Sequence, residues 1–164
     1  MITLPTHPCA ATVLAVFKDR DLRTEPFLDR SLAPGGPVVQ GQTANALHLK
    51  GCSHRISGLR WGWTTQDGEV VVEGTAGRTF ARRCLLPMDA EGWPEHLARD
   101  GVIMAAGVWR EEDHRGPASF APLIRSESFE QQTLSVLDQL IIIDEANWLE
   151  WLDPTNDVRR LYDA

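Results

Sequence analysis

The fold of this chain is decided at ISGLRWGWTT (residues 56–65) and at the QDG that follows it (residues 66–68). Apolar and polar side chains alternate along residues 56–65, which predicts a strand with Leu59, Trp61 and Trp63 on one face. An Asp-Gly pair between two β-rich runs is a strong hairpin signal, because the tight turn requires positive φ angles. The run EVVVE (residues 69–73) is therefore expected to be the returning strand.

Further strand-like runs lie on both sides of this hairpin. ALHLK (residues 46–50) alternates before it, and residues 78–86 return after it, so we expect an antiparallel β-meander over about residues 46–86. Short apolar runs predict additional strands near residues 11–17, 102–109 and 121–127. With a few helices packed on this sheet, mainly at the C-terminal end, the predicted fold class is α+β.

Helical patterns follow in the second half of the chain. Pro94 and Gly101 are suited to the first position and the stop of a short helix over residues 93–100. Ser128 and Gln131 have the spacing of a capping box, and apolar residues recur at helical spacing after them. The β-branched run LIII (residues 140–143) fits a buried strand equally well, so residues 138–146 stay open between helix and strand.

A second short helix is expected from Glu145 to Leu152, where Asp153-Pro154 ends it. The segment 127–164 is thus predicted to be mostly helical. This segment also carries the acidic excess of the chain. It has nine acidic residues and only two basic ones, Arg159 and Arg160, whereas residues 1–126 have equal numbers of acidic and basic residues. An acidic surface repels phosphates, so we expect no nucleic-acid partner and favour a basic protein partner.

The length and composition favour one domain over residues 1–164, since the chain has 164 residues, 43% hydrophobic and 24% charged. Its three cysteines, Cys9, Cys52 and Cys84, are far apart and form no CxxC pair, which is typical of reduced thiols in a cytoplasm. The first apolar run lacks a preceding basic region and no run reaches the ~18 apolar residues of a membrane span. We therefore expect a cytoplasmic protein with no membrane partner.

Aromatic residues supply two candidate binding sites. Trp148 and Trp151 lie among three acidic residues, a composition typical of the centre of a protein interface. The residues of this candidate partner surface are Trp148, Trp151, Glu145, Glu150 and Asp153. Amphipathic packing of the helix onto its own domain is the alternative interpretation.

The second candidate is a ligand pocket in the meander. Trp61 and Trp63 would line it, because small-molecule pockets are mainly apolar with a few polar groups. Its possible polar groups are His48, His54 and Asp144. An ordinary packed core beneath the sheet explains the same two tryptophans.

No catalytic, metal or cofactor motif stands out. LIIIDEAN (residues 140–147) resembles the second nucleotide motif of P-loop ATPases, but the phosphate-wrapping GxxxxGK[ST] loop that it requires is missing. The potential zinc ligands His7, Cys9, His48, Cys52 and His54 match no standard zinc module. No GxSxG elbow occurs, and the cluster from Glu111 to His114 reads as a solvated loop. We therefore expect no cofactor and no metal.

Three functions compete on these grounds. A non-catalytic protein-binding module fits the acidic C-terminal segment, for example a small acidic bacterial inhibitor or immunity-type protein that engages a basic partner through this segment. A small-molecule-binding protein or an enzyme of isomerase or cyclase type fits the Trp-lined pocket. A structural subunit of a larger assembly would be identified by a large apolar interface. The absence of a catalytic motif favours the first.

Overall fold

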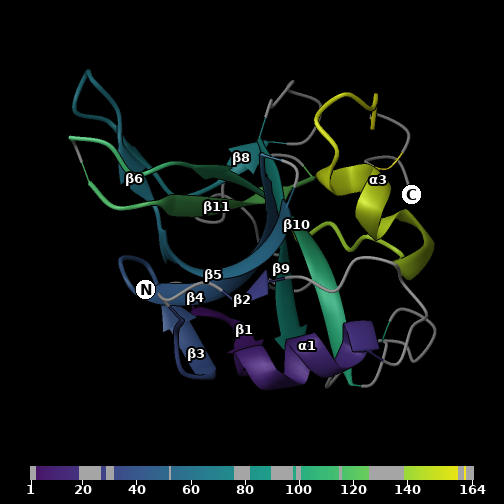
Figure 1. Cartoon of the computed structure of the whole chain (residues 1–164). Coiled ribbons are helices and arrows are strands. Elements are labelled where there is room, and N and C mark those ends of the chain that lie inside the picture. The colour runs from purple at the N-terminus through teal and green to yellow at the C-terminus, as the bar shows by residue number, and fades with distance from the viewer. Residues whose placement is uncertain are drawn as a thin grey trace.

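The computed structural model (Figure 1) shows an α+β fold in which strands dominate. It describes residues 3–18, 27–28, 32–51, 53–75, 82–89, 98, 101–114, 116–125, 139–158 and 161. The larger strands are β1 (Thr3–His7), β3 (Gly36–Val39), β4 (Thr43–Lys50), β5 (Ser53–Trp61), β9 (Arg83–Asp89), β10 (Val102–Arg110) and β11 (Ser119–Ile124). Two-residue strands are β2 (Phe27–Leu28), β6 (Trp63–Thr64), β7 (Val70–Val71) and β8 (Gly74–Thr75). The helices are α1 (Ala10–Lys18), the 3-10 turn η2 (Glu145–Asn147) and α3 (Trp148–Leu152).

Five of the strands close into a ring. They are hydrogen-bonded in the order β5-β4-β9-β10-β11, and β11 then pairs with β5 in parallel, with Ser119 opposite Arg60 and Phe120 opposite Trp61. All other pairings within the ring are antiparallel. Closure removes the two free edges that these strands would otherwise present to solvent.

The ring separates two hydrophobic clusters. The outer cluster contains Val13 and Val16 of α1 and Trp148 and Trp151 of the C-terminal segment, so this cluster lies between the ring and its helices. Figure 1 shows α1 (purple) and α3 (yellow) outside the ring. A five-stranded ring has room for side chains only, so the second cluster fills its interior. That inner cluster includes Ala44, Ala46, Leu59, Trp61, Cys84, Leu86, Met88, Ile103, Ala105, Trp109 and Phe120.

Small residues allow the interior to be filled without voids. A Cβ at Gly107 would lie 3.0 Å from the sulfur of Cys84 and 3.2 Å from a methyl group of Leu86. The inward positions Ala44, Ala46 and Ala105 are small for the same reason, since facing large and small side chains interdigitate at high density.

The expected strand at residues 11–17 is wrong, because this segment is helix α1. Its buried residues Ala10, Val13 and Val16 recur every three positions, which places them on one face of a helix, whereas Ala11, Thr12 and Ala15 are not buried. The run is short and apolar throughout, and such a run does not distinguish a strand from a helix by composition. Burial against the outer face of the ring stabilises the helix.

The hairpin around residues 66–68 and the antiparallel pairing of residues 46–50 with the following strand are confirmed. The continuous meander over residues 46–86 is wrong. Trp63 pairs with Val71 and Thr64 with Val70, in a separate sheet formed by β6 and β7. The strand expected after it returns elsewhere, since β9 pairs with β4 and β10. The strands expected near residues 102–109 and 121–127 are confirmed as β10 and β11.

Gly62 explains why the meander breaks. Its φ is +95°, a left-handed conformation that interrupts the alternation between β5 and β6. Trp61 consequently belongs to the inner cluster, while Trp63 packs against the outer cluster. The expectation that these two tryptophans share one strand face is therefore wrong.

The C-terminal segment is extended before it becomes helical. Leu140 and Ile142 form isolated bridges with Ile124 and Ala105, so residues 140–142 of the open stretch 138–146 are extended. The helix expected from Glu145 to Leu152 is confirmed as η2 followed by α3. Apart from residue 98, the helix expected over residues 93–100 lies outside the described residues, and so do residues 128–138 of the helix expected after Ser128.

We predict that Gly62→Ala destabilises the protein more than Gly68→Ala does. Both glycines have positive φ angles, but a Cβ at Gly62 would lie 3.2 Å from the Val71 carbonyl oxygen, whereas nothing lies within 4 Å at Gly68. We expect Gly68→Ala to lower the free energy of unfolding by about 1 kcal/mol and Gly62→Ala by about 1–2 kcal/mol more. Urea unfolding of both variants measures this, and equal losses would show that the close approach at Gly62 is unimportant.

Candidate functional site

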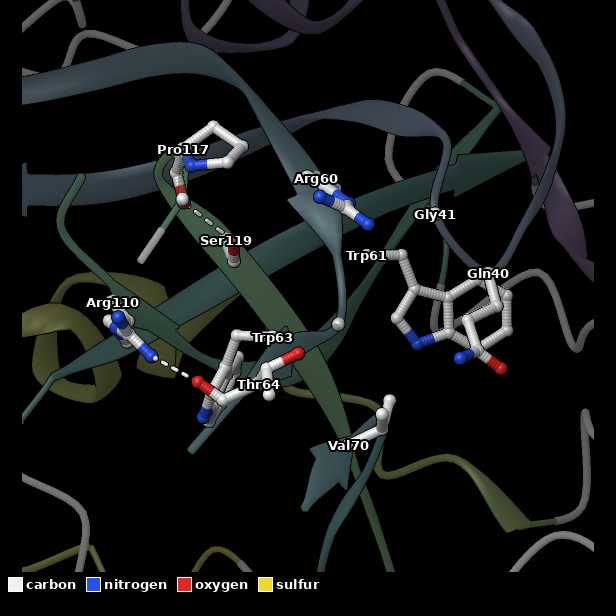
Figure 2. Close-up of a pocket in the computed structure, with 12 residues that line it drawn as sticks. Gln40, Gly41, Arg60, Trp61, Trp63, Thr64, Val70, Arg110, Pro117 and Ser119 are labelled. Atoms are coloured by element: carbon white, nitrogen blue, oxygen red, sulfur yellow. Dashed lines mark hydrogen bonds between the residues drawn. The ribbon is translucent and has the colours of Figure 1, made fainter. Parts of the chain in front are cut away.

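A hollow of about 190 Å³ lies where the end of β5 meets β6, β7 and the β10–β11 loop (Figure 2). We call it the Trp61–Trp63 hollow. Its lining is formed by Gln40, Gly41, Arg60, Trp61, Gly62, Trp63, Thr64, Val70, Arg110, Gly116, Pro117 and Ser119. The ring closure thus brings together side chains that are up to about eighty positions apart in the sequence.

Backbone hydrogen bonds fix the walls of this hollow. The amide of Arg60 donates to the Ala118 carbonyl at 3.0 Å, and the amide of Gly62 donates to the Phe120 carbonyl at 2.9 Å. On the other side, the Trp61 carbonyl accepts from the Gly41 amide at 3.0 Å. A site that is built on paired strands is more precise than one built on loops alone.

The two tryptophans contribute different surfaces. Trp61 is only 1% exposed, its indole N–H donates to the Val72 carbonyl at 2.7 Å, and its ring is stacked on Phe120 with 6.5 Å between centroids. Trp63 is half-buried and lies across the hollow beside Thr64 (Figure 2). The hollow therefore has a fixed aromatic floor and a more accessible aromatic wall.

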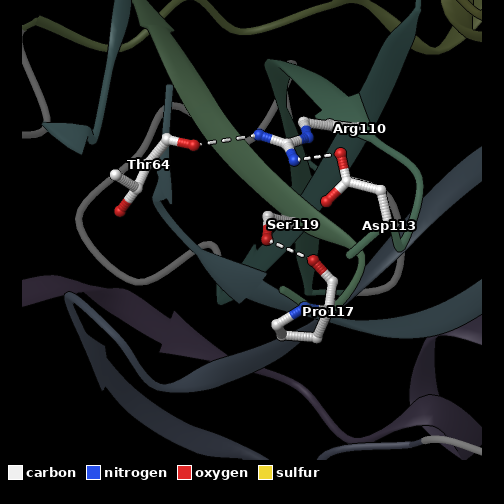
Figure 3. Close-up of polar contacts among 5 residues, drawn as sticks. All are labelled: Thr64, Arg110, Asp113, Pro117 and Ser119. Carbon is white, nitrogen blue, oxygen red and sulfur yellow. Dashed lines mark hydrogen bonds and ion pairs between the residues drawn. The ribbon is translucent and has the colours of Figure 1, made fainter. Parts of the chain in front are cut away.

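Two arginines give the hollow its charge. Arg110 donates from Nη1 to the Thr64 carbonyl at 3.3 Å and pairs from Nη2 with Asp113 at 2.5 Å (Figure 3). Asp113 itself is held by a turn in which its backbone and that of Gly116 exchange hydrogen bonds. The guanidinium of Arg60 is exposed and makes no hydrogen bond or ion pair with any residue that the structure describes.

This arrangement can bind an anionic group. Arginine presents a planar set of N–H donors that matches carboxylate and phosphate oxygens, and it stacks on aromatic faces. Arg60 has all of its donors available within the described structure, while Arg110 has two of its nitrogens engaged. In the view of Figure 2 the Arg60 guanidinium lies above Trp61, Trp63 and Thr64.

The polar groups predicted for this pocket lie elsewhere. His48 is buried inside the ring, where its Nε2 is 2.8 Å from the Ser57 hydroxyl and its ring is 4.3 Å from that of Trp109. His54 is half-buried near Asp153, and Asp144 is exposed just before η2. Only Trp61 and Trp63 of the predicted pocket residues line the hollow.

The partner surface predicted around Trp148 and Trp151 is not found as expected, because its two aromatic residues are buried. Trp148 and Trp151 are 1% and 0% exposed, and their indole N–H groups donate to the carbonyls of Ile143 and Cys84 at 2.9 and 2.8 Å. The expectation that they are exposed anchors is wrong, because both rings complete the outer cluster. The side chains of Glu145, Glu150 and Asp153 remain partly exposed at this end of the molecule.

The five candidate zinc ligands do not gather within the described part of the chain. His7 is buried in β1 and Cys9 is exposed just before α1, while His48 lies inside the ring. Cys52 is outside the described residues. No group of three or more His, Cys, Asp or Glu side chains that could hold a metal occurs among the residues that are described.

Sequence reasoning missed Arg60, Arg110 and Ser119. Strict alternation along residues 56–65 puts Arg60 on the face opposite to Trp61, and Arg110 comes directly before the cluster from Glu111 to His114 that was interpreted as a solvated loop. The glycine between the two tryptophans was the available signal, because an isolated glycine inside a strand pattern indicates a bulge or a close backbone approach. The parallel pairing of β5 with β11 brings Ser119 to the hollow, and such long-range pairing produces no local pattern in the sequence.

Comparisons with known proteins give the fold alone. No family model matches the chain, and no curated protein matches it. A phage-related protein from Bordetella bronchiseptica is similar in structure, with a TM-score of 0.57 and 16% identity over 82% of this chain and 77% of that chain. A protein from Bacteroides thetaiotaomicron has a TM-score of 0.60 and 12% identity over 99% of this chain and 85% of that chain. Among the described residues, no helix has the length and apolarity to cross a membrane.

His54 makes the stability of the protein depend on pH. Burial lowers the pKa of His54 below its ordinary 6.5, and the nearby Asp153 carboxylate opposes this only in part. The hydrogen bond from the Thr155 side chain is the main reason that the pKa of Asp153 is lowered, so Asp153 stays ionised above pH 5. The contribution of neutral His54 to the free energy of unfolding is therefore fully present above about pH 6.5, the ordinary pKa of histidine. This contribution is lost as the pH falls towards the lowered pKa of His54 in the folded protein.

We predict that the free energy of unfolding decreases between pH 7.5 and 5.5, and that His54→Gln makes this decrease smaller. The unfolded chain takes up a proton at His54 in this range that the folded protein resists. His114→Gln is the matched control, because His114 is an exposed residue of the β10–β11 loop. Urea unfolding at several pH values measures the effect, and an unchanged slope in His54→Gln would contradict it.

Proposed function

We propose that this chain is a non-catalytic binding protein whose Trp61–Trp63 hollow takes a small anionic group. The observation that carries the proposal is the Arg60 guanidinium, which lines the hollow and has no partner among the described residues. An exposed cation beside aromatic walls binds a carboxylate or a phosphate more strongly than it binds a neutral group.

The size of the hollow limits its ligand. Pockets for drug-sized molecules have volumes of ~300 Å³ or more, and this hollow has about 190 Å³. The ligand is therefore a small anion with a short planar body, or the anionic end of a larger molecule. The planar body would lie against Trp63, because the ring of Trp61 is almost fully covered.

Preorganisation supports a binding role. The floor is fixed by the hydrogen bond of the Trp61 indole to Val72, and Arg110 is fixed by Thr64 and Asp113. Little side-chain freedom of these residues is lost when a ligand enters, which lowers the entropic cost of binding. The exposed side chain of Arg60 and the half-buried side chain of Trp63 remain to be ordered by the ligand.

The proposed setting is a cytoplasm. Cys9 is a free and exposed thiol, and the hydrogen bond to the Thr12 hydroxyl lowers its pKa. An exposed free thiol is typical of proteins from reducing compartments. The inner thiol of Cys84 is buried, and burial raises its pKa.

We predict that benzoate binds in the hollow and that Arg60→Gln weakens its affinity by about 3- to 10-fold, since a charged hydrogen bond contributes ~1 kcal/mol at a partly exposed site. Benzamide is the matched neutral ligand and should bind weakly to both proteins. Arg125→Gln, which removes an exposed arginine that is not part of the lining, is the control variant. Two-dimensional NMR titration of the Trp63 indole resonance measures the affinities, and phenyl phosphate tested in parallel separates carboxylate from phosphate preference.

The proposal fails on either of two results. One is equal binding of benzoate and benzamide, which would make the charge of Arg60 irrelevant. The other is a shift of the Trp63 resonance that Arg125→Gln abolishes as fully as Arg60→Gln, which would indicate general electrostatic attraction rather than a built site.

A second candidate function is the docking of a basic protein on the C-terminal segment. Leu149 is 37% exposed on α3, and Asp144, Glu145 and Glu150 surround it in the sequence. An exposed apolar residue with an acidic rim has the layout of a small interface core. This surface replaces the one centred on Trp148 and Trp151.

We predict that a basic partner captured from the source cells at low salt is lost at high salt and also on Leu149→Arg. The positive charge that Leu149→Arg introduces repels a cationic surface, and salt screens the attraction between the acidic rim and a basic partner. Leu32→Arg is the control, because Leu32 is 39% exposed and lies in a different part of the chain. Native mass spectrometry of the purified complexes measures the loss; equal loss with Leu32→Arg would argue against this surface.

A further inference from the structure

A second hollow, of about 250 Å³, lies in the seam between the ring and the C-terminal segment. The end of β4, the start of β9 and the end of β10 form one side of it, and the chain around the end of α3 forms the other. We call it the seam hollow. Its lining residues are Leu49, Lys50, Gly51, Arg82, Arg83, Trp109, Glu111, Leu152 and Pro154, none of which lines the Trp61–Trp63 hollow.

One buried arginine fixes the far wall of the seam hollow. Arg83 donates from Nε to the Trp151 carbonyl at 2.6 Å and from Nη2 to the carbonyls of Asp153 and Asn156. Its guanidinium also lies 5.4 Å from the centre of the Trp151 ring. The residues Leu152 and Pro154 are therefore held in place against β9, so this wall exists before any ligand arrives.

The lip of the seam hollow is cationic. Arg82 lies over the ring of Trp109, with 5.4 Å from its central carbon to the centroid, and pairs with Glu111 at 3.1 Å. Lys50 is exposed at the end of β4. Among the exposed lining residues, the basic Lys50 and Arg82 outnumber the acidic Glu111, in a chain whose net charge is −7.

The floor of the seam hollow is apolar. Trp109 is 7% exposed, and Leu152 and the half-buried Leu49 complete the surface. Burial of an apolar body on this floor is favourable by ~25 cal/mol per Å² of area removed from water. An inorganic anion would leave this apolar surface unused, whereas an organic acid would cover it.

We propose that the seam hollow is a binding site for a small organic acid, with its carboxylate at Lys50 and Arg82 and its apolar body against Trp109 and Leu152. This inference does not depend on the function proposed for the Trp61–Trp63 hollow, because the two sites share no lining residue. The hollow is smaller than the ~300 Å³ of drug-sized sites, which suits a single ring or short chain that carries one carboxylate.

The test uses the full chain and 3-phenylpropionate as the probe. We expect saturable shifts of the Trp109 indole resonance and of the Gly51 amide in two-dimensional NMR titrations, since both residues line the seam hollow. The neutral alcohol 3-phenylpropanol has the same apolar body, so it should bind several-fold more weakly. Inorganic phosphate should produce no saturable shift, because it has no apolar body.

Three variants locate the site. Lys50→Gln and Arg82→Gln should each weaken 3-phenylpropionate binding about 3-fold, as is typical of one charge at a solvated lip. Arg60→Gln should leave the titration of Trp109 unchanged, because Arg60 lies at the other hollow. Both lip residues are exposed, so their substitution is compatible with the fold, and urea unfolding confirms this for each variant.

Two results would overturn the inference. The first is the absence of a saturable shift at Trp109 up to millimolar probe concentrations. The second is a titration that Arg60→Gln weakens as much as Lys50→Gln or Arg82→Gln does, which would place the acid at the Trp61–Trp63 hollow. Loss of benzoate binding at that hollow, by contrast, would leave the seam hollow unaffected.

Discussion

The parallel pairing of β5 with β11 is the constraint on which the rest of the structure depends. It joins Arg60 to Ser119 and Trp61 to Phe120, and it turns an open sheet into a ring. Ring closure gives the chain an interior for its small and aromatic residues and an outer surface on which α1 and the C-terminal segment pack. It joins residues about sixty positions apart, so its formation is opposed by a large loop-closure entropy and must be stabilised by both clusters together.

The sequence allowed the local parts of this fold to be predicted and left the non-local part open. Alternation and the Asp67-Gly68 turn located the β6–β7 hairpin, and apolar runs located β10 and β11. An apolar run of the same kind led to a wrong strand prediction at α1. Its composition is compatible with a strand or a helix, and the segment is helical because one face packs against the ring. Ring closure itself has no sequence signature, because parallel pairing across a long separation follows from the packing of the whole molecule.

The candidate sites show the same limit. Trp61 and Trp63 both line the hollow, but they do not share the strand face that the alternation predicted, because Gly62 interrupts it. The arginines beside them, Arg60 and Arg110, come from the ends of β5 and β10 and were missed. His48, His54 and Asp144, which were expected there, do not line the hollow. Trp148 and Trp151 were expected outside because acidic residues flank them, yet every third or fourth residue of this short helical segment faces the ring.

Both hollows carry exposed basic residues although the protein as a whole is acidic. The two observations are compatible because the effect of a charged group is limited to its surroundings. The electrostatic field of an exposed group is screened beyond ~8 Å at physiological ionic strength, so the net charge of −7 does not decide what a hollow attracts. Arg60 in one hollow, and Lys50 with Arg82 in the other, set the local preference for anions. In Figure 1 β6 and α3 are on opposite sides of the ring. A basic partner on α3 and an anion beside β6 would therefore occupy separate surfaces, and neither would have to displace the other.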